Sequence, residues 1–310
     1  MIPASELPAD GLHEGVPFAD YLAWPAVSRS GVLEPMRRSP AYYKATKGTD
    51  NRTPAKNLGS ALNDLALQPH LFPDRFILTT KCVARTGKGE PCTSNGSIVI
   101  DGLCYCGKHA DKGDATKGGP MLLTPEQHAL AVAMAEAIQA SPEASAFLKA
   151  APGREVSMLW TDPHTKLRCK GRLDICGESD PFVYRAGDLK MSRAAHPAEF
   201  SREANKFGYH RQAAWYLTGL RALGIVCDEF TDIAVANTVP HEVYVYDLIQ
   251  DAVMLGQEQN RAALDLYHEC VQTNRWPGGG RFPLSLPAWA MGQNDDDNED
   301  GADDGATEVA

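Results

Sequence analysis

Long apolar runs are missing from this 310-residue sequence, so no segment has the length and apolar character of a membrane-spanning helix. The N-terminus also lacks the basic stretch followed by an apolar stretch that marks a secretory signal peptide. The composition, with 43% hydrophobic and 23% charged residues, is that of an ordinary globular protein. We therefore expect a cytoplasmic protein without a membrane partner.

Basic residues are absent from residues 293–310, which hold eight of the 40 acidic side chains. The whole chain has a formal charge of -10, but without this segment 30 basic residues face 32 acidic ones, a difference of about −2. A body this close to neutral neither requires nor excludes a nucleic-acid partner. The segment is rich in Asp, Gly, Ala and Asn, and we expect it to be a disordered acidic tail.

The eight cysteines are not evenly spread, because four of them fall within 25 residues: Cys82, Cys92, Cys104 and Cys106. Without a secretory signal, disulfide bonds are not expected, and a bound metal is the better interpretation of the cluster. The cluster lies in a polar, glycine-rich segment, residues 79–119, that is too long for an unstructured loop in a compact domain.

A tetrahedral zinc ion would order this segment, with the ligands Cys82, Cys92, Cys106 and His109. Thiolates and imidazole are suitable zinc ligands, and the CxxH spacing lets two of them share one tight turn. Cys104 is an alternative to Cys106, since spacing alone does not choose between them. Four protein ligands leave no open position, so this zinc is expected to be structural. The alternatives are idle thiols or an iron–sulfur cluster on four cysteines.

The rest of the chain shows helical and strand-like patterns. Capping residues and apolar periodicity predict four helices with both ends defined, at residues 57–67, 141–150, 197–223 and 248–273. A further helix is predicted to begin at residue 124. Earlier, Ser28 or Ser30 and Ser39 are each predicted to begin a short helix. Strands are predicted at residues 155–160, 167–176, 182–191, 231–237 and 242–247.

Two neighbouring predicted strands each carry one aspartate, Asp174 and Asp188. Strand alternation places Asp174 on one face of its strand and Leu173 and Ile175 on the other. The same rule places Asp188 and Lys190 on a common face of the second strand. The sequence therefore predicts two carboxylates and a lysine close together on adjacent strands.

Such a site is suited to hydrolysis of a phosphodiester bond. The carboxylates of Asp174 and Asp188 and the backbone carbonyl of Leu189 are hard oxygen ligands, which suit Mg²⁺ or Mn²⁺. The ion would polarise the scissile phosphate and lower the pKa of an attacking water, and Lys190 would orient that water or neutralise developing charge. Gln212 and Tyr216 are four residues apart and share a helix face, where both can bind phosphate or orient Lys190.

The set GRLD, GDLK and YHRQAAWY, which contains these residues, resembles the PD-(D/E)XK nuclease superfamily. More narrowly, the chain resembles the RecE-type (exonuclease VIII family) exodeoxyribonucleases of phages and prophages. The likeness covers about residues 10–275 and includes GVPFADYL, LGSALNDLAL and EVSMLWTDP, with the cysteine insert and the tail outside it. It implies an α/β fold with a central mixed β-sheet flanked by helices. The expected parts are a helical part (1–78), a zinc-binding insert (79–119), a nuclease core (120–292) and the tail (293–310).

Family members degrade linear double-stranded DNA from 5′ ends with Mg²⁺ and leave a 3′ single strand for an annealing protein. They are similar in this to lambda exonuclease, a ring-shaped oligomer. The resemblance implies that Asp174 and Asp188 bind metal, that Lys190 assists catalysis, and that Gln212 and Tyr216 support the site. It also implies DNA ends, a phage single-strand annealing protein and a ring-like homo-oligomer as partners.

One residue departs from the family pattern. Where the family usually has the histidine of GSALH, which contacts a metal, this chain has Asn63. The amide carbonyl of Asn63 can bind Mg²⁺ but is uncharged, so either the site is weaker, or Asp64 or a water takes this place. Two other interpretations remain: a different PD-(D/E)XK nuclease, either an endonuclease or an iron–sulfur enzyme of the AddB kind, and an inactive protein that binds DNA ends.

Overall fold

The computed structural model describes residues 7–48, 53–94, 96, 98–100, 103–106, 108–109, 121–180, 183–281 and 283–284. The predicted acidic tail lies outside these residues. Within them, none of the helices combines the length and the apolar character needed to cross a bilayer.

A six-stranded mixed sheet forms the centre of the molecule, in the order β1-β6-β7-β8-β9-β10. Its strands are β1 (Gly11–His13), β6 (Gly153–Thr161), β7 (Arg168–Asp180), β8 (Val183–Ser192), β9 (Phe230–Ala236) and β10 (Val243–Asp247). All neighbours are antiparallel except β8 and β9, which are parallel. The five predicted strands are therefore present, and β1 is an additional edge strand that pairs with β6.

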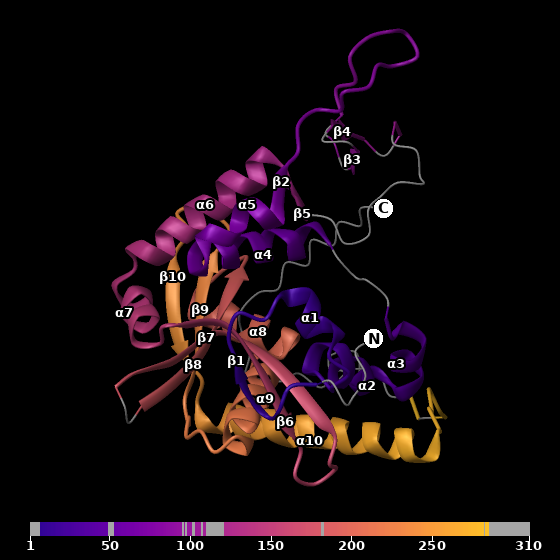
Figure 1. Ribbon diagram of the computed structural model, residues 1–310, viewed down its shortest axis with the longest axis vertical. Coiled ribbons are helices and arrows are strands. Elements are labelled where there is room, and N and C mark those ends of the chain that lie inside the picture. Colours follow the sequence, from indigo (N-terminus) through magenta and orange to yellow (C-terminus); the bar gives the residue numbers. More distant parts are fainter. Residues whose placement is uncertain are drawn as a thin grey trace, which may run out of the picture.

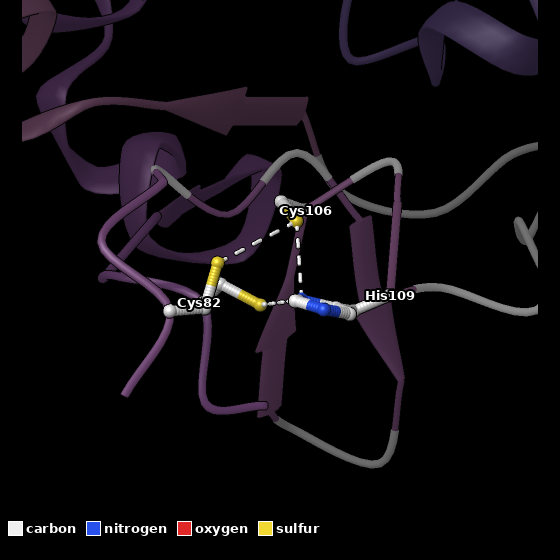
Figure 2. Close-up of side chains that lie close together, drawn as sticks. Cys82, Cys106 and His109 are labelled. Atoms are coloured by element: carbon white, nitrogen blue, oxygen red, sulfur yellow. Dashed lines mark hydrogen bonds between the residues drawn. The ribbon is translucent and has the colours of Figure 1, made fainter. Parts of the chain in front are cut away.

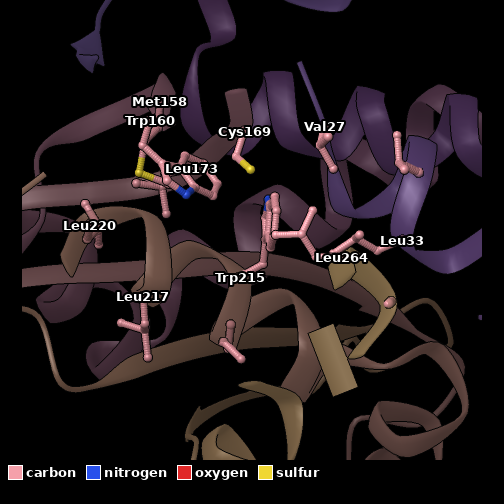
Figure 3. Packing of buried hydrophobic residues seen from close by; sticks show 14 of the residues in the cluster. Val27, Leu33, Met158, Trp160, Cys169, Leu173, Trp215, Leu217, Leu220 and Leu264 are labelled. Carbon is pink, nitrogen blue, oxygen red and sulfur yellow. The ribbon is translucent and has the colours of Figure 1, made fainter. Parts of the chain in front are cut away.

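Helices cover both faces of the sheet (Figure 1). One face packs against α9 (Tyr209–Ala222) and α10 (Gln250–Thr273), together with the π-helix Arg29–Leu33, α2 (Glu34–Arg38) and α3 (Pro40–Thr46). Figure 3 shows Trp215 of α9 in the middle of this cluster, close to Trp160 of β6. The other face packs against α4 (Pro54–Leu67), α6 (Pro125–Ala140) and α7 (Pro142–Ala150). The expected helix-flanked mixed sheet is confirmed.

Capping side chains begin several of these helices where the sequence predicted. The hydroxyls of Ser28, Ser39 and Ser141 accept from backbone N–H groups three residues ahead. Thr124 and Gln127 form a full capping box at the start of α6. Ser28 caps the π-helix Arg29–Leu33, which runs directly into α2.

The prediction of a single long helix at residues 197–223 is wrong. The segment forms two helices, α8 (Pro197–Phe207) and α9, separated by Gly208. Gly208 has a φ of 70°, a left-handed conformation that glycine adopts without a Cβ penalty. A Cβ at this position would also collide with the guanidinium of Arg211. The break allows α9 to take a direction of its own across the sheet.

The cysteine insert leaves the body through β2 (Phe76–Leu78) and returns through β5 (Met121–Leu123). These two strands are parallel and in register, and the Thr79 N–H donates to the Leu123 carbonyl at 2.7 Å. The insert contains a short hairpin of β3 (Ile98–Ile100) and β4 (Leu103–Tyr105), and it projects away from the sheet beyond α4 (Figure 1). The remaining short elements are α1 (Phe18–Ala23), a 3₁₀ turn (Pro69–Leu71) and α5 (Phe72–Arg75).

Candidate functional site

The predicted catalytic residues lie where β7 and β8 separate. Backbone pairing between the two strands extends to Ile175 opposite Gly187 and does not include Asp174 or Asp188. The Leu189 N–H instead donates to Oδ2 of Asp174 at 3.4 Å. Because the N–H and C=O of one strand residue point to the same side, the Leu189 carbonyl faces the same opening. The opening thus presents oxygen atoms from both strands.

The prediction that Leu173 and Ile175 share one face of β7 is wrong, because the alternation of side chains breaks at Asp174. Leu173 packs with the cluster under α9, whereas Ile175 packs on the opposite face with Leu189. The partner strand is irregular at the same level, since Glu155 of β6 lies between the paired positions and has a φ of 51°. This irregularity places Asp174 at the edge of the opening instead of within the regular ladder.

Lys190 connects Asp188 to the helix above the sheet. Its ammonium contacts Oδ2 of Asp188 and donates to Oε1 of Gln212 at 2.7 Å. The amide nitrogen of Gln212 donates to the same Asp188 oxygen at 3.0 Å and to the Tyr216 hydroxyl at 3.3 Å. The ring of Tyr216 approaches β7 closely, because Gly171 has no Cβ; an added Cβ would lie 3.0 Å from it. The four predicted residues Asp188, Lys190, Gln212 and Tyr216 form one hydrogen-bonded chain.

Because the side chains of the site are buried, the protonation of each charged group depends on the charges of its neighbours. Asp188 is 3% and Lys190 8% exposed. Burial raises the pKa of Asp174, while the charge of Lys190 and the hydrogen bond from Asn63 act against it. Burial lowers the pKa of Lys190, and the charges of Asp232 and Asp174 oppose that shift. Removing one member leaves an uncompensated buried charge, which is strongly unfavourable.

Asn63 reaches the site from α4. Its amide nitrogen donates to Oδ2 of Asp174 at 3.0 Å, so a rotated amide would present its oxygen to the opening. Asp64, the alternative to Asn63, forms an ion pair with Arg75 at 2.6 Å. Glu155 is paired with Arg172 at 2.6 Å. Burial and the neighbouring Asp174 raise the pKa of Glu155 to about 7, in spite of this ion pair.

Asp232 is a buried carboxylate that the sequence reasoning missed. It lies on β9 directly opposite Asp188 of β8 and is 2% exposed. Burial raises the pKa of Asp232 to about 6, against the opposing charge of Lys190. The signal was present in the sequence, because an acidic residue interrupts the apolar strand FTDIAVA.

The donor set fits a hard divalent cation. Two buried carboxylates, Asp188 and Asp232, and the partly buried Asp174 accompany the ammonium of Lys190, which leaves an excess of two negative charges. The nearby acidic groups of Glu155 and Asp64 are each neutralised by an arginine. Carboxylate and carbonyl oxygens are the ligands that Mg²⁺ and Mn²⁺ prefer.

The insert brings together Cys82, Cys92, Cys106 and His109, whose ligand atoms all lie within 4.8 Å of one another. Figure 2 shows Cys82, Cys106 and His109 of this cluster pointing toward one another. The Cys92 and Cys106 sulfurs are 3.9 Å apart, and Nδ1 of His109 lies 3.4 and 3.5 Å from Cys82 and Cys106. Tetrahedral zinc with ordinary bond lengths requires about 3.8 Å between sulfurs and about 3.6 Å between sulfur and nitrogen. This Cys₃His cluster could therefore bind zinc.

Cys104 does not belong to the cluster. Its sulfur instead accepts a hydrogen bond from the backbone N–H of Thr80 at 3.3 Å. Backbone hydrogen bonds from Ser94 and Lys108 lower the pKa values of Cys92 and Cys106 respectively, whereas burial raises the pKa of Cys82. The alternative ligand set with Cys104 is thus not the one that the fold assembles, and three thiolates with one imidazole do not match a four-cysteine iron–sulfur site.

Comparison with known proteins places this geometry in a family. None of the curated proteins compared with the chain matches it. Among solved structures, a protein of Eubacterium rectale provisionally named an exonuclease superposes with a TM-score of 0.50 at 14% identity, covering 88% of this chain and 97% of its own. SSO0001 superposes with a TM-score of only 0.26 at 16% identity, covering 46% and 67%, and supports no conclusion. Residues 29–281 match the family of PDDEXK-like domains of unknown function (DUF3799). The chain belongs to this PDDEXK-like family.

Proposed function

We propose that the protein is a metal-dependent exodeoxyribonuclease that degrades linear double-stranded DNA. The observation that carries the proposal is the opening between β7 and β8, where Asp174, Asp188 and the Leu189 carbonyl face one another beside Lys190. Bound Mg²⁺ or Mn²⁺ at these oxygens would supply Lewis-acid activation of the phosphate and of the attacking water. The PDDEXK-like fold and the exonuclease name of the structural neighbour support the nuclease assignment.

The remaining residues orient the reacting groups. Lys190 places its ammonium at the opening, where it stabilises the negative charge that develops on the phosphate in the transition state. Gln212 holds Lys190 and Asp188 in position through its two hydrogen bonds, and Tyr216 fixes the amide of Gln212. Because α9 carries both residues, the orientation of this helix determines the geometry of the site.

The finer features of the proposal rest on the resemblance to the RecE-type enzymes. We propose 5′ to 3′ degradation that exposes a 3′ single strand, a phage annealing protein as partner in recombination, and a ring-like homo-oligomer around DNA. The zinc of the insert has a structural role in this proposal, because four protein ligands close its coordination.

Digestion of end-labelled linear duplexes tests the activity. Duplexes labelled at either the 5′ or the 3′ end are incubated with the protein in Mg²⁺ or in EDTA. Early release of the 5′ label as mononucleotides, in Mg²⁺ only and abolished by Asp188→Ala, is the expected result. Early release of the 3′ label would reverse the proposed polarity.

A closed circular duplex of the same sequence distinguishes the alternatives. An exonuclease leaves the circle intact, whereas cutting of the circle would identify an endonuclease. Binding of linear ends with no digestion in either Mg²⁺ or Mn²⁺ would favour a protein that binds DNA ends without cleaving them.

A further inference from the structure

Asp232 is the buried carboxylate that the proposed reaction does not yet use. Its Oδ1 atom is buried and makes no hydrogen bond within the part of the chain that the structure describes. A buried carboxylate oxygen without a partner is unfavourable, so its presence in the middle of an apolar strand needs a compensating charge. Lys190 of the neighbouring strand β8, itself buried, can supply that charge.

The register of the sheet explains why these groups interact. In the parallel pair β8–β9, Asp188 is opposite Asp232, and Lys190 is opposite Ala234. Paired residues of adjacent strands point to the same face and their backbones lie about 4.8 Å apart, so both carboxylates lie on the face that Lys190 shares. Lys190 therefore has one carboxylate on its own strand and another on the neighbouring strand.

The two carboxylates have different surroundings. Asp188 already accepts hydrogen bonds from Lys190 and Gln212, and it borders the opening that faces Asp174. A divalent cation at that opening would draw on the same Asp188 oxygens that now hold Lys190. Asp232 lies on the far strand, away from β7, and its charge stays available to the ammonium.

We propose that Asp232 is a positioning residue that holds the Lys190 side chain beside the site when Asp188 turns to the metal. This inference rests on the proposed function and deepens it. It also explains the charge count, because Asp232 balances Lys190 while Asp174 and Asp188 together balance one divalent ion. Without Asp232, Lys190 competes with the metal for Asp188.

Manganese binding separates this role from that of a direct ligand. Mn²⁺ affinity is measured by electron paramagnetic resonance in the full chain for the wild type, Asp232→Asn, Lys190→Met and the double variant. Asp232→Asn keeps the shape of the side chain and is expected to weaken Mn²⁺ binding about 10- to 100-fold. In the double variant the competing ammonium is also gone, so Mn²⁺ affinity returns to within about threefold of Lys190→Met.

Kinetics provide the second readout. Asp232→Asn is expected to lower kcat about 100-fold while KM for DNA changes less than about threefold, and Asp232→Glu should recover part of kcat. If Asp232→Asn does not fold, as judged by circular dichroism, the double variant without either charge and Asp232→Glu still give the comparison, because neither leaves an unpaired lysine.

Three outcomes have distinct meanings. Wild-type Mn²⁺ affinity and kcat in Asp232→Asn would overturn the inference. A double variant that binds Mn²⁺ as weakly as Asp232→Asn would also overturn it, since Asp232 would then be a ligand. Failure of the wild type to bind Mn²⁺, or equal binding by Asp188→Asn, would instead overturn the proposed function.

Discussion

The candidate active-site opening between β7 and β8 and the cysteine insert present possible metal ligands in opposite ways. The opening is built on long, buried strands, and its polar groups are fixed by a sheet and a helix that pack around a large apolar core. The described residues of the insert form a hairpin of two three-residue strands and a small buried cluster made mainly of Cys82, Cys92 and Cys106. The body therefore positions ligands for a metal, whereas in the insert the metal itself would supply most of the stability.

The ligand chemistry follows the same division. Oxygen ligands on rigid strands suit an ion that keeps waters and an open side for substrate. Three thiolates and an imidazole suit a closed zinc site. The two donor sets differ in kind and lie on different elements, so each can be disrupted separately.

Loss of zinc is the largest expected effect. Cys92→Ser should reduce bound zinc from about one ion per chain to nearly none, because structural zinc contributes about 10–16 kcal/mol to folding of such small units. Residues 79–119 should become sensitive to protease, while the unfolding temperature of the body changes by less than about 4 °C. Metal analysis and limited proteolysis measure these changes.

Cys104→Ser is the matched control, because Cys104 is buried in the same insert but lies outside the ligand set. It should retain zinc. Loss of zinc in Cys104→Ser together with retention in Cys92→Ser would show that the ligand assignment is wrong.

Asp188→Asn tests the opening between β7 and β8. Removing this charge should lower nuclease activity at least about 10³-fold, since a metal ligand and the partner of Lys190 are lost together. Zinc content should remain at the wild-type level. Asp251→Asn, an exposed carboxylate in the first turn of α10, serves as the control and should keep full activity in the end-label digestion assay.

Asp162 belongs to neither metal site and reports on the body alone. Its carboxylate accepts from Thr165 at 2.7 Å and from Arg261 at 2.8 Å. Burial raises the pKa of Asp162, but hydrogen bonds from Arg261 and Thr165 outweigh burial and hold it below its ordinary value. Asp162→Asn should lower the free energy of unfolding by about 1–3 kcal/mol at pH 7.

The pH dependence of that loss has a definite sign. Since the folded-state pKa is the lower one, the contribution of Asp162 is complete above its unfolded value of about 3.9 and disappears as the pH falls through the folded value. Urea unfolding of both proteins at pH 7 and in acid measures the difference. A gap that persists unchanged in acid would contradict an electrostatic origin.

Asn63 should give the smallest effect. Asn63→Ala removes the hydrogen bond to Asp174 and should raise the Mg²⁺ concentration for half-maximal activity about three- to tenfold, without loss of zinc. Asn63→His introduces the residue that the RecE-type enzymes carry and should lower that concentration below the Asn63→Ala value. If the wild type, Asn63→Ala and Asn63→His require the same Mg²⁺ concentration, Asn63 does not contribute to metal binding.

The comparison also shows what sequence patterns can predict. The spacing of Gln212 and Tyr216 predicted a shared helix face, and Lys190 was placed beside Asp188 by strand periodicity; both relations depend only on local geometry. The position of Asp232 depends on which strand lies next to β8, and local spacing does not contain that information. The break of alternation at Asp174 coincides with the irregular backbone of Glu155 on the neighbouring strand, which local spacing does not contain either.

The ligands of the insert were likewise predicted only as far as local spacing determines them. Spacing identified the segment and most of its ligands but did not choose between Cys104 and Cys106, which depends on how the β3–β4 hairpin turns its side chains. The helix break differs, because Gly208 was visible in the sequence. A glycine inside a helical pattern is tolerated often enough that its left-handed conformation had to be observed.

The parallel pairing of β2 with β5 has a consequence for how the insert can be engineered. The chain enters the insert after Leu78, at one end of the pair, and returns at Met121, which is paired with Phe76 at the other end. Because two parallel strands cannot be joined by a tight turn, a crossover must run back along the pair whatever the insert contains. The segment can therefore be exchanged for another crossover of roughly a dozen residues or more, whereas a two-residue turn in its place would break the β2–β5 pair.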